Sequence, residues 1–241
     1  MQVIIDSTAK CVSEAAERFS ALLRRKPDAV LGLATGSTPE ALYGQLIAQY
    51  EAGFISFKQV TTFNLDEYVG LDGNHPQSYR HFMQEKLFDH VDIDPGRTHV
   101  PDGLHTTPEN ASDYDKMIEK AGGIDLLLLG IGTNGHIGFN EPGCSFDALT
   151  HITDLEESTR QANARFFASP EEVPMQAVTM GIHTIMQARS IILMAFGANK
   201  AQAIEGAVIG PVTADLPASI LRLHPDVTIF ADDDAAAGIK A

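Results

Sequence analysis

The residues with the clearest potential for chemistry lie in the stretch IDLLLLGIGTNGHIGFNEP, residues 124–142. An aliphatic run, residues 125–129, leads directly into a series of glycines that contains His136 and Glu141. The run is too short and too apolar for a surface helix, so it predicts a buried parallel strand. Ligands of open α/β sheets bind at the carboxyl ends of such strands. An imidazole both donates and accepts protons at neutral pH, so this junction predicts an active site with proton-transfer groups.

The glycines of this stretch also match the dinucleotide pattern G-x-G-x-x-G, from Gly130 to Gly135. That pattern binds a nicotinamide cofactor only where the third glycine opens a helix whose N-terminus faces the pyrophosphate. Gly138, Pro142 and Gly143 disfavour a helix at this position. A dinucleotide site is therefore the weaker interpretation, and we expect no bound cofactor.

A second segment, LATGSTP at residues 33–39, follows another predicted strand and suits a phosphate group. Gly36 allows a sharp backbone turn, and Ser37 and Thr38 supply hydroxyl groups. Pro39 is favourable as the first residue of a helix whose free amide groups point back at the loop. No G-K-[ST] follows, so it is not a Walker loop. Taken alone, the segment is equally consistent with an ordinary capped helix.

A third segment, TTFNLDEY at residues 61–68, places Asp66 and Glu67 just beyond a predicted strand. Adjacent residues of an extended chain point in opposite directions, so at most one of these carboxylates faces a shared cleft. The other caps a helix or lies in water. As an isolated pair they would be read as a solvated strand end. Together, the three segments bring an anion-binding loop, a carboxylate and a histidine to one edge of one sheet.

Strand and helix patterns alternate along the whole chain, which predicts an α/β fold with a single open, doubly wound, mostly parallel sheet covered by helices on both faces, similar to a Rossmann fold. Expected strands are 1–5, 29–34, 60–64, 125–129, 190–195 and 227–231; expected helices are 7–26 with Ser7 as its cap, 39–51, 77–88, 108–120 and 200–205. The length of 241 residues suits one domain, residues 1–241. Residues 154–174 lack a clean period and contain two prolines, so we expect a mobile lid there.

Composition limits the classes of partner. The chain has 17 basic and 32 acidic residues and a net charge of −15, which disfavours nucleic acid and anionic membranes as partners. A small anionic substrate remains compatible, because exposed charges are screened beyond about 8 Å at physiological salt. No apolar run approaches the roughly 18 to 20 residues of a membrane span, and the first residues do not resemble a signal peptide. Cys11 and Cys144 alone support neither a disulfide framework nor a cysteine-rich metal site, so we expect a cytoplasmic protein.

The three segments are part of a wider resemblance. The chain resembles the short bacterial type of glucosamine-6-phosphate deaminase, of the glucosamine/galactosamine-6-phosphate isomerase family. The similarity extends over nearly the whole chain, because the matching blocks are spread from the second predicted strand to the late helices: LATGSTP, FNLDEYVGL, HPQSY, GIGTNGHIGFNEPG, TRQANARFF and GANKAQAI. The resemblance implies an enzyme of amino-sugar catabolism, a hydrolase or isomerase of N-acetylglucosamine degradation. It would convert glucosamine 6-phosphate and water into fructose 6-phosphate and ammonia, with no metal required.

The resemblance also implies roles for individual residues. Asp66 would take the proton from C2 of the sugar and help to deliver it to C1, and His136 would open the pyranose ring with Glu141 orienting it. Phosphate binding would fall to Gly36, Ser37, Thr38, Arg165 and Lys200. The longer members of the family carry an aspartate at the position of Asn134, and an amide lacks its negative charge. We therefore expect Glu141 to be the carboxylate partner of His136.

The longer members also have basic residues near the position of His151 and a longer C-terminal tail, both associated with allosteric activation and hexamers. Here we expect little such activation and a monomer or small homo-oligomer. Two other functions remain open. A 6-phosphogluconolactonase would share the fold and a similar glycine–histidine loop, but it needs no base at C2, so Asp66 favours the deaminase. A non-catalytic sugar-phosphate sensor would usually carry a partner-binding module, for which this chain has no spare segment.

Overall fold

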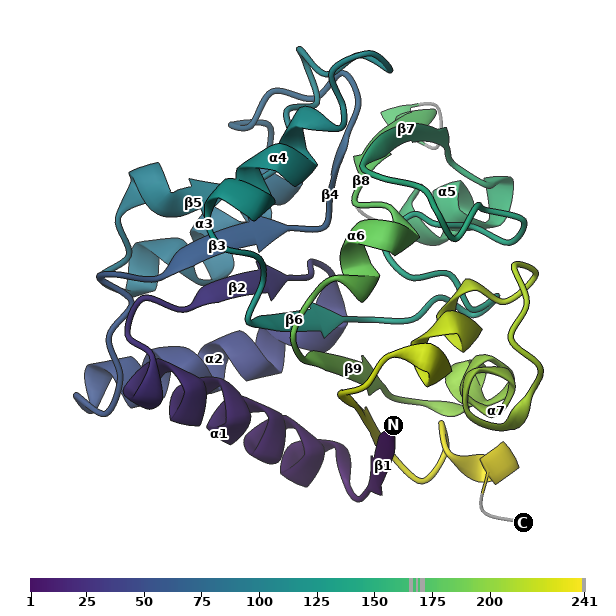
Figure 1. Ribbon diagram of the computed structural model, residues 1–241, viewed down its shortest axis with the longest axis horizontal. Coiled ribbons are helices and arrows are strands. Elements are labelled where there is room, and N and C mark those ends of the chain that lie inside the picture. The colour runs from purple at the N-terminus through teal and green to yellow at the C-terminus, as the bar shows by residue number, and fades with distance from the viewer. Residues whose placement is uncertain (165–166, 168, 170–171, 240–241) are drawn as a thin grey trace.

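The structure, a computed structural model, describes residues 1–164, 167, 169 and 172–239. Within this part of the chain, seven parallel strands form the central sheet (Figure 1). Their order across the sheet is β1 (Gln2–Ile5), β10 (Val227–Ala231), β9 (Ile191–Ala195), β6 (Leu126–Leu129), β2 (Val30–Leu33), β3 (Thr61–Asn64) and β5 (Thr98–His99). The predicted doubly wound, mostly parallel α/β sheet is thus confirmed.

Helices cover both faces of this sheet, which is why β2, β6 and β9 are apolar and buried along their whole length. Helices α1 and α2 lie on one side, and α4 and α6 lie on the other (Figure 1). The α-helices are α1 (Thr8–Arg25), α2 (Ser37–Glu51), α3 (Tyr79–Lys86), α4 (Asp113–Lys120), α5 (Glu157–Asn163), α6 (Ile182–Met186) and α7 (Ala201–Ile209). Short 3-10 helices are η1 (Phe88–His90), η2 (Pro95–Arg97), η5 (Ala198–Lys200), η6 (Pro217–Leu223) and η7 (Ala237–Ile239). No helix in the described ranges is both long and apolar enough to cross a membrane.

The helix boundaries differ from the expected ones at several places. Helix α2 begins at Ser37 rather than Pro39, because a proline is tolerated anywhere in a first turn, where no amide hydrogen is needed. Helix α4 begins only at Asp113, since the preceding residues form turns. Ser7 does precede α1, but its side chain makes no capping hydrogen bond, and its amide instead donates to the carboxylate of Asp6.

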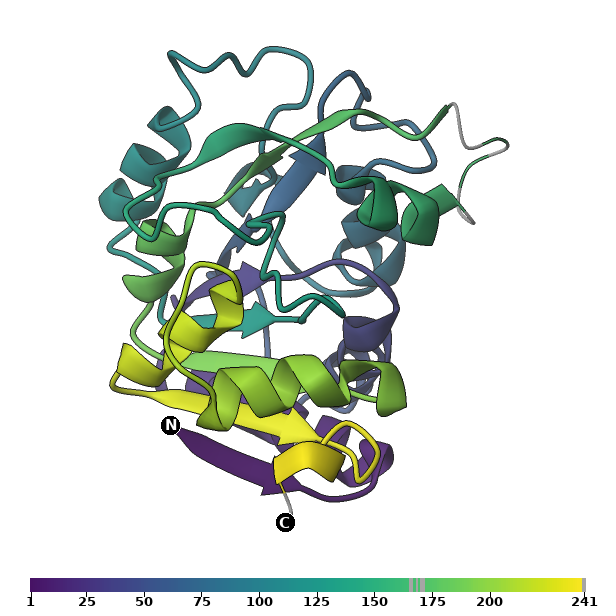
Figure 2. The same ribbon diagram turned by 90° about the vertical axis from the view of Figure 1, so that its right-hand side faces the viewer.

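A second, three-stranded antiparallel sheet lies beside the first and was not predicted. Its order is β4 (Asp66–Tyr68), β8 (Gln176–Thr179) and β7 (His151–Asp154), and Figure 2 shows it above the central sheet. These strands are three or four residues long, and they pair with partners distant in the sequence, with Asp66 opposite Thr179. Short strands of this kind leave only a weak alternation in the sequence. This sheet fixes the direction of the chain just after β3.

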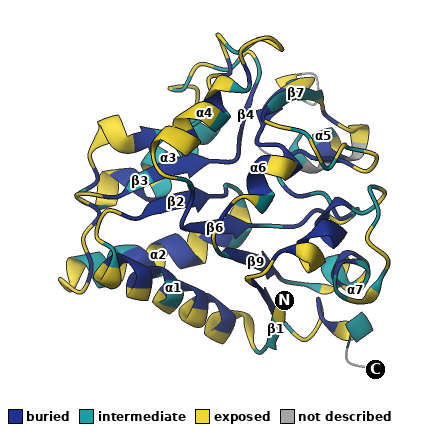
Figure 3. Cartoon of the chain, viewed as in Figure 1, coloured by how far each residue is buried: buried dark blue, intermediate teal, exposed yellow. Residues whose placement is uncertain are grey.

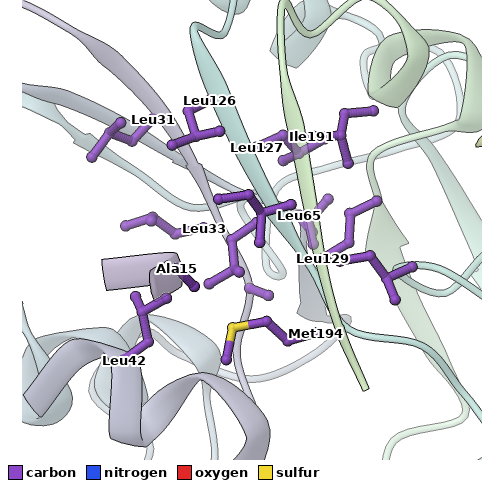
Figure 4. Close-up of a cluster of buried hydrophobic side chains, with 14 of the residues drawn as sticks. Ala15, Leu31, Leu33, Leu42, Leu65, Leu126, Leu127, Leu129, Ile191 and Met194 are labelled. Atoms are coloured by element: carbon purple, nitrogen blue, oxygen red, sulfur yellow. The ribbon is translucent and has the colours of Figure 1, made fainter. Parts of the chain in front are cut away.

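The hydrophobic core lies between the central sheet and the helices (Figure 3). Figure 4 shows leucines of β2 and β6 beside Ala15 of α1, Leu42 of α2 and Met194 of β9. All of these side chains are buried. Each fully buried leucine contributes on the order of 1.5 to 3 kcal/mol, so this layer holds the strand ends at fixed positions.

The connection of the central strands creates a crevice at the middle of the sheet. Strands β2 and β6 are neighbours, but the chain continues from β2 toward β3 and β5, and from β6 toward β9 and β10. The loops after β2 and β6 therefore leave the sheet edge in opposite directions. Such a switch point is where open α/β sheets bind their ligands.

Gly181, which follows β8 and precedes α6, is closely packed against the backbone that leads into β7. A methyl group there would lie 2.1 Å from the carbonyl oxygen of Ala148 and 2.2 Å from that of Leu149. Because backbone atoms cannot yield as the end of a side chain can, we expect Gly181→Ala to cost roughly 2 kcal/mol or more. Thermal unfolding should show a melting temperature lower by at least about 4 °C.

The matched control is Gly44→Ala, at an exposed position inside α2 with no atom within 4 Å of the added methyl group. This change should stabilise the chain by about 0.5 to 1 kcal/mol, because alanine loses less backbone entropy than glycine. A Gly181→Ala variant that melts at or above the wild-type temperature would contradict the predicted clash.

Candidate active site

A cavity of about 290 Å³ opens at the switch point between β2 and β6. Its walls are the loop after β2, residues 34–38, the loop after β6 that contains Asn134 and His136, and Asp66 at the start of β4. Tyr79, Thr159, Asn163 and Lys200 also line it. The volume is close to the lower end of the range for small-molecule sites. The three segments selected from the sequence therefore meet in one cavity.

Asp66 and Glu67 point in opposite directions, as expected for adjacent residues of a strand. Asp66 lines the cavity, whereas Glu67 accepts backbone hydrogen bonds from Tyr68 and Tyr79 at one oxygen and from Arg80 at the other, each 2.9 or 3.0 Å long. Two of these donors are the first amides of α3. Glu67 therefore has a structural role at the start of that helix, and Asp66 is the carboxyl group available for chemistry.

The environment of Asp66 raises the pKa of its carboxyl group toward neutral pH. Burial, and secondarily the nearby charge of Glu67, raise the pKa of Asp66 to about 8. Its side chain is 7% exposed, and no described residue donates a hydrogen bond to its carboxylate. A raised pKa in a cleft is typical of a general acid or base.

His136 lies beside Glu141 in the loop after β6. Its Nδ1 atom is 3.2 Å from Oε2 of Glu141, although the two are not aligned as a hydrogen bond. Gly132 is required for the position of the imidazole, because a methyl group there would lie 2.3 Å from the ring. The structure thus brings His136 to the carboxylate expected from the sequence.

Glu141 is held at both oxygens. Oε2 accepts a hydrogen bond of 2.7 Å from Nδ2 of Asn134, and Oε1 accepts one of 2.6 Å from Oγ1 of Thr159. Burial works against the ionised form, but the contacts with His136, Thr159 and Asn134 outweigh it, so the pKa of Glu141 is lower than usual. Asn134 also accepts a hydrogen bond from the amide of His136, at 3.2 Å. Asn134 therefore organises the loop without adding a charge.

Another part of the cavity wall suits an anion. Gly36 adopts a φ of 96°, which favours glycine, and the 15-residue helix α2 begins at Ser37 with its free amides at the cavity. Lys200 approaches from η5, after β9, and is partly buried. Burial lowers the pKa of Lys200, and no described carboxylate pairs with it. Its charge is thus free for a ligand.

The structure therefore gathers Asp66, Asn134, His136, Glu141 and Lys200 with the loop of Gly36, Ser37 and Thr38; of these, Glu141 lies directly behind the cavity wall. Arg165, which with Lys200 was one of the two cations predicted to bind phosphate, lies outside the described residues. Sequence reasoning missed Tyr79, Thr159 and Asn163, which also line the cavity. The signal was present, since these residues belong to the blocks HPQSY and TRQANARFF, but nothing local tells which side chain of a block faces a ligand.

Comparisons with known proteins identify the family of the chain. Residues 5–230 match the family described as glucosamine-6-phosphate isomerases/6-phosphogluconolactonase. A glucosamine-6-phosphate deaminase of Rhodopirellula baltica is 56% identical over 218 residues, or 89% of this chain and 86% of that protein. The solved structure of a monomeric glucosamine-6-phosphate deaminase has a TM-score of 0.96 and 44% identity, and the match covers 99% of this chain and 100% of that one.

The lactonases are more distant. The crystal structure of a 6-phosphogluconolactonase from Leishmania guyanensis covers 100% of this chain and 99% of its own, with a TM-score of 0.76 and 21% identity, which shows a shared fold alone. The matched family description names isomerases, so hydrolase is too narrow a class for these proteins. The resemblance seen in the sequence is confirmed: the chain belongs to the glucosamine-6-phosphate isomerase/6-phosphogluconolactonase family and, within it, to the glucosamine-6-phosphate deaminases.

Proposed function

We propose that this protein converts glucosamine 6-phosphate and water into fructose 6-phosphate and ammonia, by aldose–ketose isomerisation followed by loss of the amino group. The observation that carries the proposal is that one cavity is lined by the buried carboxyl group of Asp66, the imidazole of His136 and the N-terminus of helix α2. High identity to glucosamine-6-phosphate deaminases supports the same reaction.

The phosphate group of the substrate would bind the start of α2 through the amides and hydroxyls of Ser37 and Thr38, with Lys200 as counter-charge. Arg165 is proposed as a second cation. Anchoring the phosphate end orients the sugar ring toward Asp66 and His136, and well-positioned reactants gain on the order of 7 to 11 kcal/mol. The expected lid at residues 154–174 lies partly outside the described residues. In its described part, Thr159 and Asn163 of α5 contribute to the cavity wall, and we propose that α5 covers the bound substrate within this single domain.

His136 would then open the pyranose ring. It removes the proton from the O1 hydroxyl and returns one to the ring oxygen, while Glu141 orients the imidazole and stabilises its charged form. Ring opening produces an aldehyde at C1, which acidifies the proton on C2. The proposed role of Glu141 agrees with its lowered pKa, because the carboxylate stays ionised beside the imidazole.

Asp66 would take the C2 proton and deliver it to C1, while O1 gains one proton and the amino group loses one, which leaves a C1 alcohol and a protonated ketimine at C2. Water adds to this carbon and ammonia departs, which gives the ketose phosphate. The protonated amino group of the bound substrate would favour the ionised form of Asp66, because a nearby positive charge lowers a carboxyl pKa. A lactonase reaction has no C2 proton to transfer, so the placement of Asp66 supports the deaminase over that alternative.

We further propose that the enzyme acts in the breakdown of N-acetylglucosamine in the cytoplasm. A monomer or small homo-oligomer is supported by the monomeric state named for the related deaminase structure. Its partners would then be limited to the small-molecule substrate, consistent with the net charge of −15.

The central test is to supply glucosamine 6-phosphate without added metal and to measure both ammonia and fructose 6-phosphate. We expect the wild type to form both in equal amounts, and Asp66→Asn to lower kcat by about 10² to 10⁴-fold, because the amide cannot carry the proton. The control Asp113→Asn, at an exposed residue of α4, should retain full activity. A wild type that forms no ammonia disproves the proposed function, and an active Asp66→Asn variant disproves only the role of Asp66.

The raised pKa of Asp66 predicts the pH dependence of the reaction. The free enzyme must carry ionised Asp66 to accept the C2 proton, so kcat/KM should increase with pH up to a limb near the pKa of about 8. The measurement is kcat/KM from pH 5 to 10. A profile with no decrease between pH 8 and pH 5 would mean that the base is an ordinary solvated carboxylate.

The same group links stability to pH. Because the folded-state pKa of Asp66 lies above the usual value of 3.8, its protonated form stabilises the fold below pH 3.8, and this contribution is lost as the pH rises through about 8. Asp66→Asn stays neutral, so its melting temperature relative to wild type should rise between pH 6 and 9. Each kcal/mol corresponds to about 2 to 4 °C for a chain of this size. A constant difference across this range would contradict the burial of an ionising carboxyl group.

Lys200 should act in binding rather than in chemistry. We expect Lys200→Met to raise KM at least tenfold, about 1.4 kcal/mol, with kcat changed by less than about threefold, because a charge lost at the phosphate end weakens substrate and transition state alike. Lys116→Met, at an exposed residue, is the matched control. Inorganic phosphate should also inhibit Lys200→Met less than wild type. Equal KM values for the two variants would remove Lys200 from the phosphate site.

A further inference from the structure

Helix α5 touches the proposed ring-opening machinery through one side chain that the reaction scheme does not use. Thr159 is 7% exposed and belongs to α5, and its hydroxyl donates to Oε1 of Glu141 at 2.6 Å. Thr159 and Asn163 are four residues apart, so they share one face of the helix, and both line the cavity. The helix that forms part of the cavity wall is therefore bonded to the carboxylate beside His136.

The hydrogen bond from Thr159 helps to determine the orientation of the Glu141 carboxylate. The other oxygen, Oε2, is held by Asn134 at 2.7 Å and lies 3.2 Å from Nδ1 of His136, near contact but out of hydrogen-bond alignment. A carboxylate fixed at one oxygen can still rotate about that bond. The second donor, from α5, removes this freedom and sets the angle at which Oε2 faces the imidazole.

We propose that Thr159 is a positioning residue, which holds the carboxylate of Glu141 at the angle that His136 needs for ring opening and thereby couples this step to the position of α5 over the cavity. The inference rests on the proposed deaminase function. It deepens that function by making the cavity wall part of the proton relay. Substrate contacts that move α5 would change the alignment of Glu141 and His136 through this bond.

Thr159 also affects the charge of Glu141. Its hydroxyl is one of the donors that keep the pKa of Glu141 low against the effect of burial. Among the described residues, the titratable groups facing Glu141 are His136 and Cys144, and the remaining contacts come from the uncharged Asn134 and Thr159. Loss of the hydroxyl should therefore raise the pKa of Glu141, because the ionised carboxylate loses a hydrogen bond.

The test compares Thr159→Val, which replaces the hydroxyl by a methyl group of similar size, with Thr159→Ser, which keeps the hydroxyl. We expect Thr159→Val to lower kcat about tenfold or more with KM within about threefold, because loss of a hydrogen bond to the charged carboxylate disturbs ring opening but not substrate binding. Thr159→Ser should restore most of the lost kcat. The matched control is Thr150→Val, which removes a buried threonine hydroxyl that donates to Asp115 at 3.0 Å, away from the cavity. It should leave kcat unchanged.

A second readout does not depend on turnover. The ¹³C resonance of the Glu141 carboxyl group should titrate at higher pH in Thr159→Val than in wild type or Thr159→Ser. If the wild type makes no ammonia, the proposed function fails, yet this titration still tests the positioning role. If the wild type is active and Thr159→Val keeps its kcat and its Glu141 titration, the inference is overturned. It is also overturned if Thr159→Ser loses as much as Thr159→Val, because packing would then be responsible. Should Thr159→Val fail to fold by circular dichroism, Thr159→Ala replaces it with the same criteria.

Discussion

The site depends on the parallel pairing of β2 with β6 at the centre of the sheet. Parallel strands end at the same sheet edge, and these two release their chains in opposite directions, so a crevice must form between their loops. The leucines of both strands are buried between helix layers, which holds the strand ends at fixed positions. The loop after β2, which contains Gly36, and the loop after β6, which contains His136, therefore face one another across this crevice.

The third group of the site reaches this crevice by a different route. Strand β4 leaves the central sheet after β3 and pairs with β8, which places Asp66 in the cavity wall and turns Glu67 toward α3. The consequence is a buried carboxyl group that accepts no hydrogen bond from the described part of the chain, which is unfavourable for stability once it ionises. Active sites commonly retain such groups because their chemistry requires them. The neighbouring Glu67, with its three backbone donors, shows how the same chain satisfies a carboxylate whose role is structural.

Charge is arranged locally rather than globally. A chain with a net charge of −15 would not attract an anionic ligand by its overall field, yet the start of α2 and Lys200 both line the cavity. Asp66 and His136 line the same cavity, and Glu141 lies 3.2 Å from the imidazole. The cavity thus places local partners for an anion beside groups that can transfer protons.

Much of the fold and part of the site followed from local patterns. The aliphatic run at residues 125–129, the alternation of strands with helices, the turn at Gly36 and the opposite directions of Asp66 and Glu67 are all properties of short segments, and the structure agrees with them. Family blocks in the sequence added the reaction and its residues. What required the tertiary structure was every relation between distant segments. The pairing of β4 with β8, the bond from Thr159 to Glu141, the cavity wall formed by Tyr79 and the strong burial of Asp66 arise only when segments far apart in the chain pack together. Local sequence sets backbone preference and apolar periodicity, whereas burial, pKa and hydrogen-bond partners depend on neighbours that only the folded chain supplies.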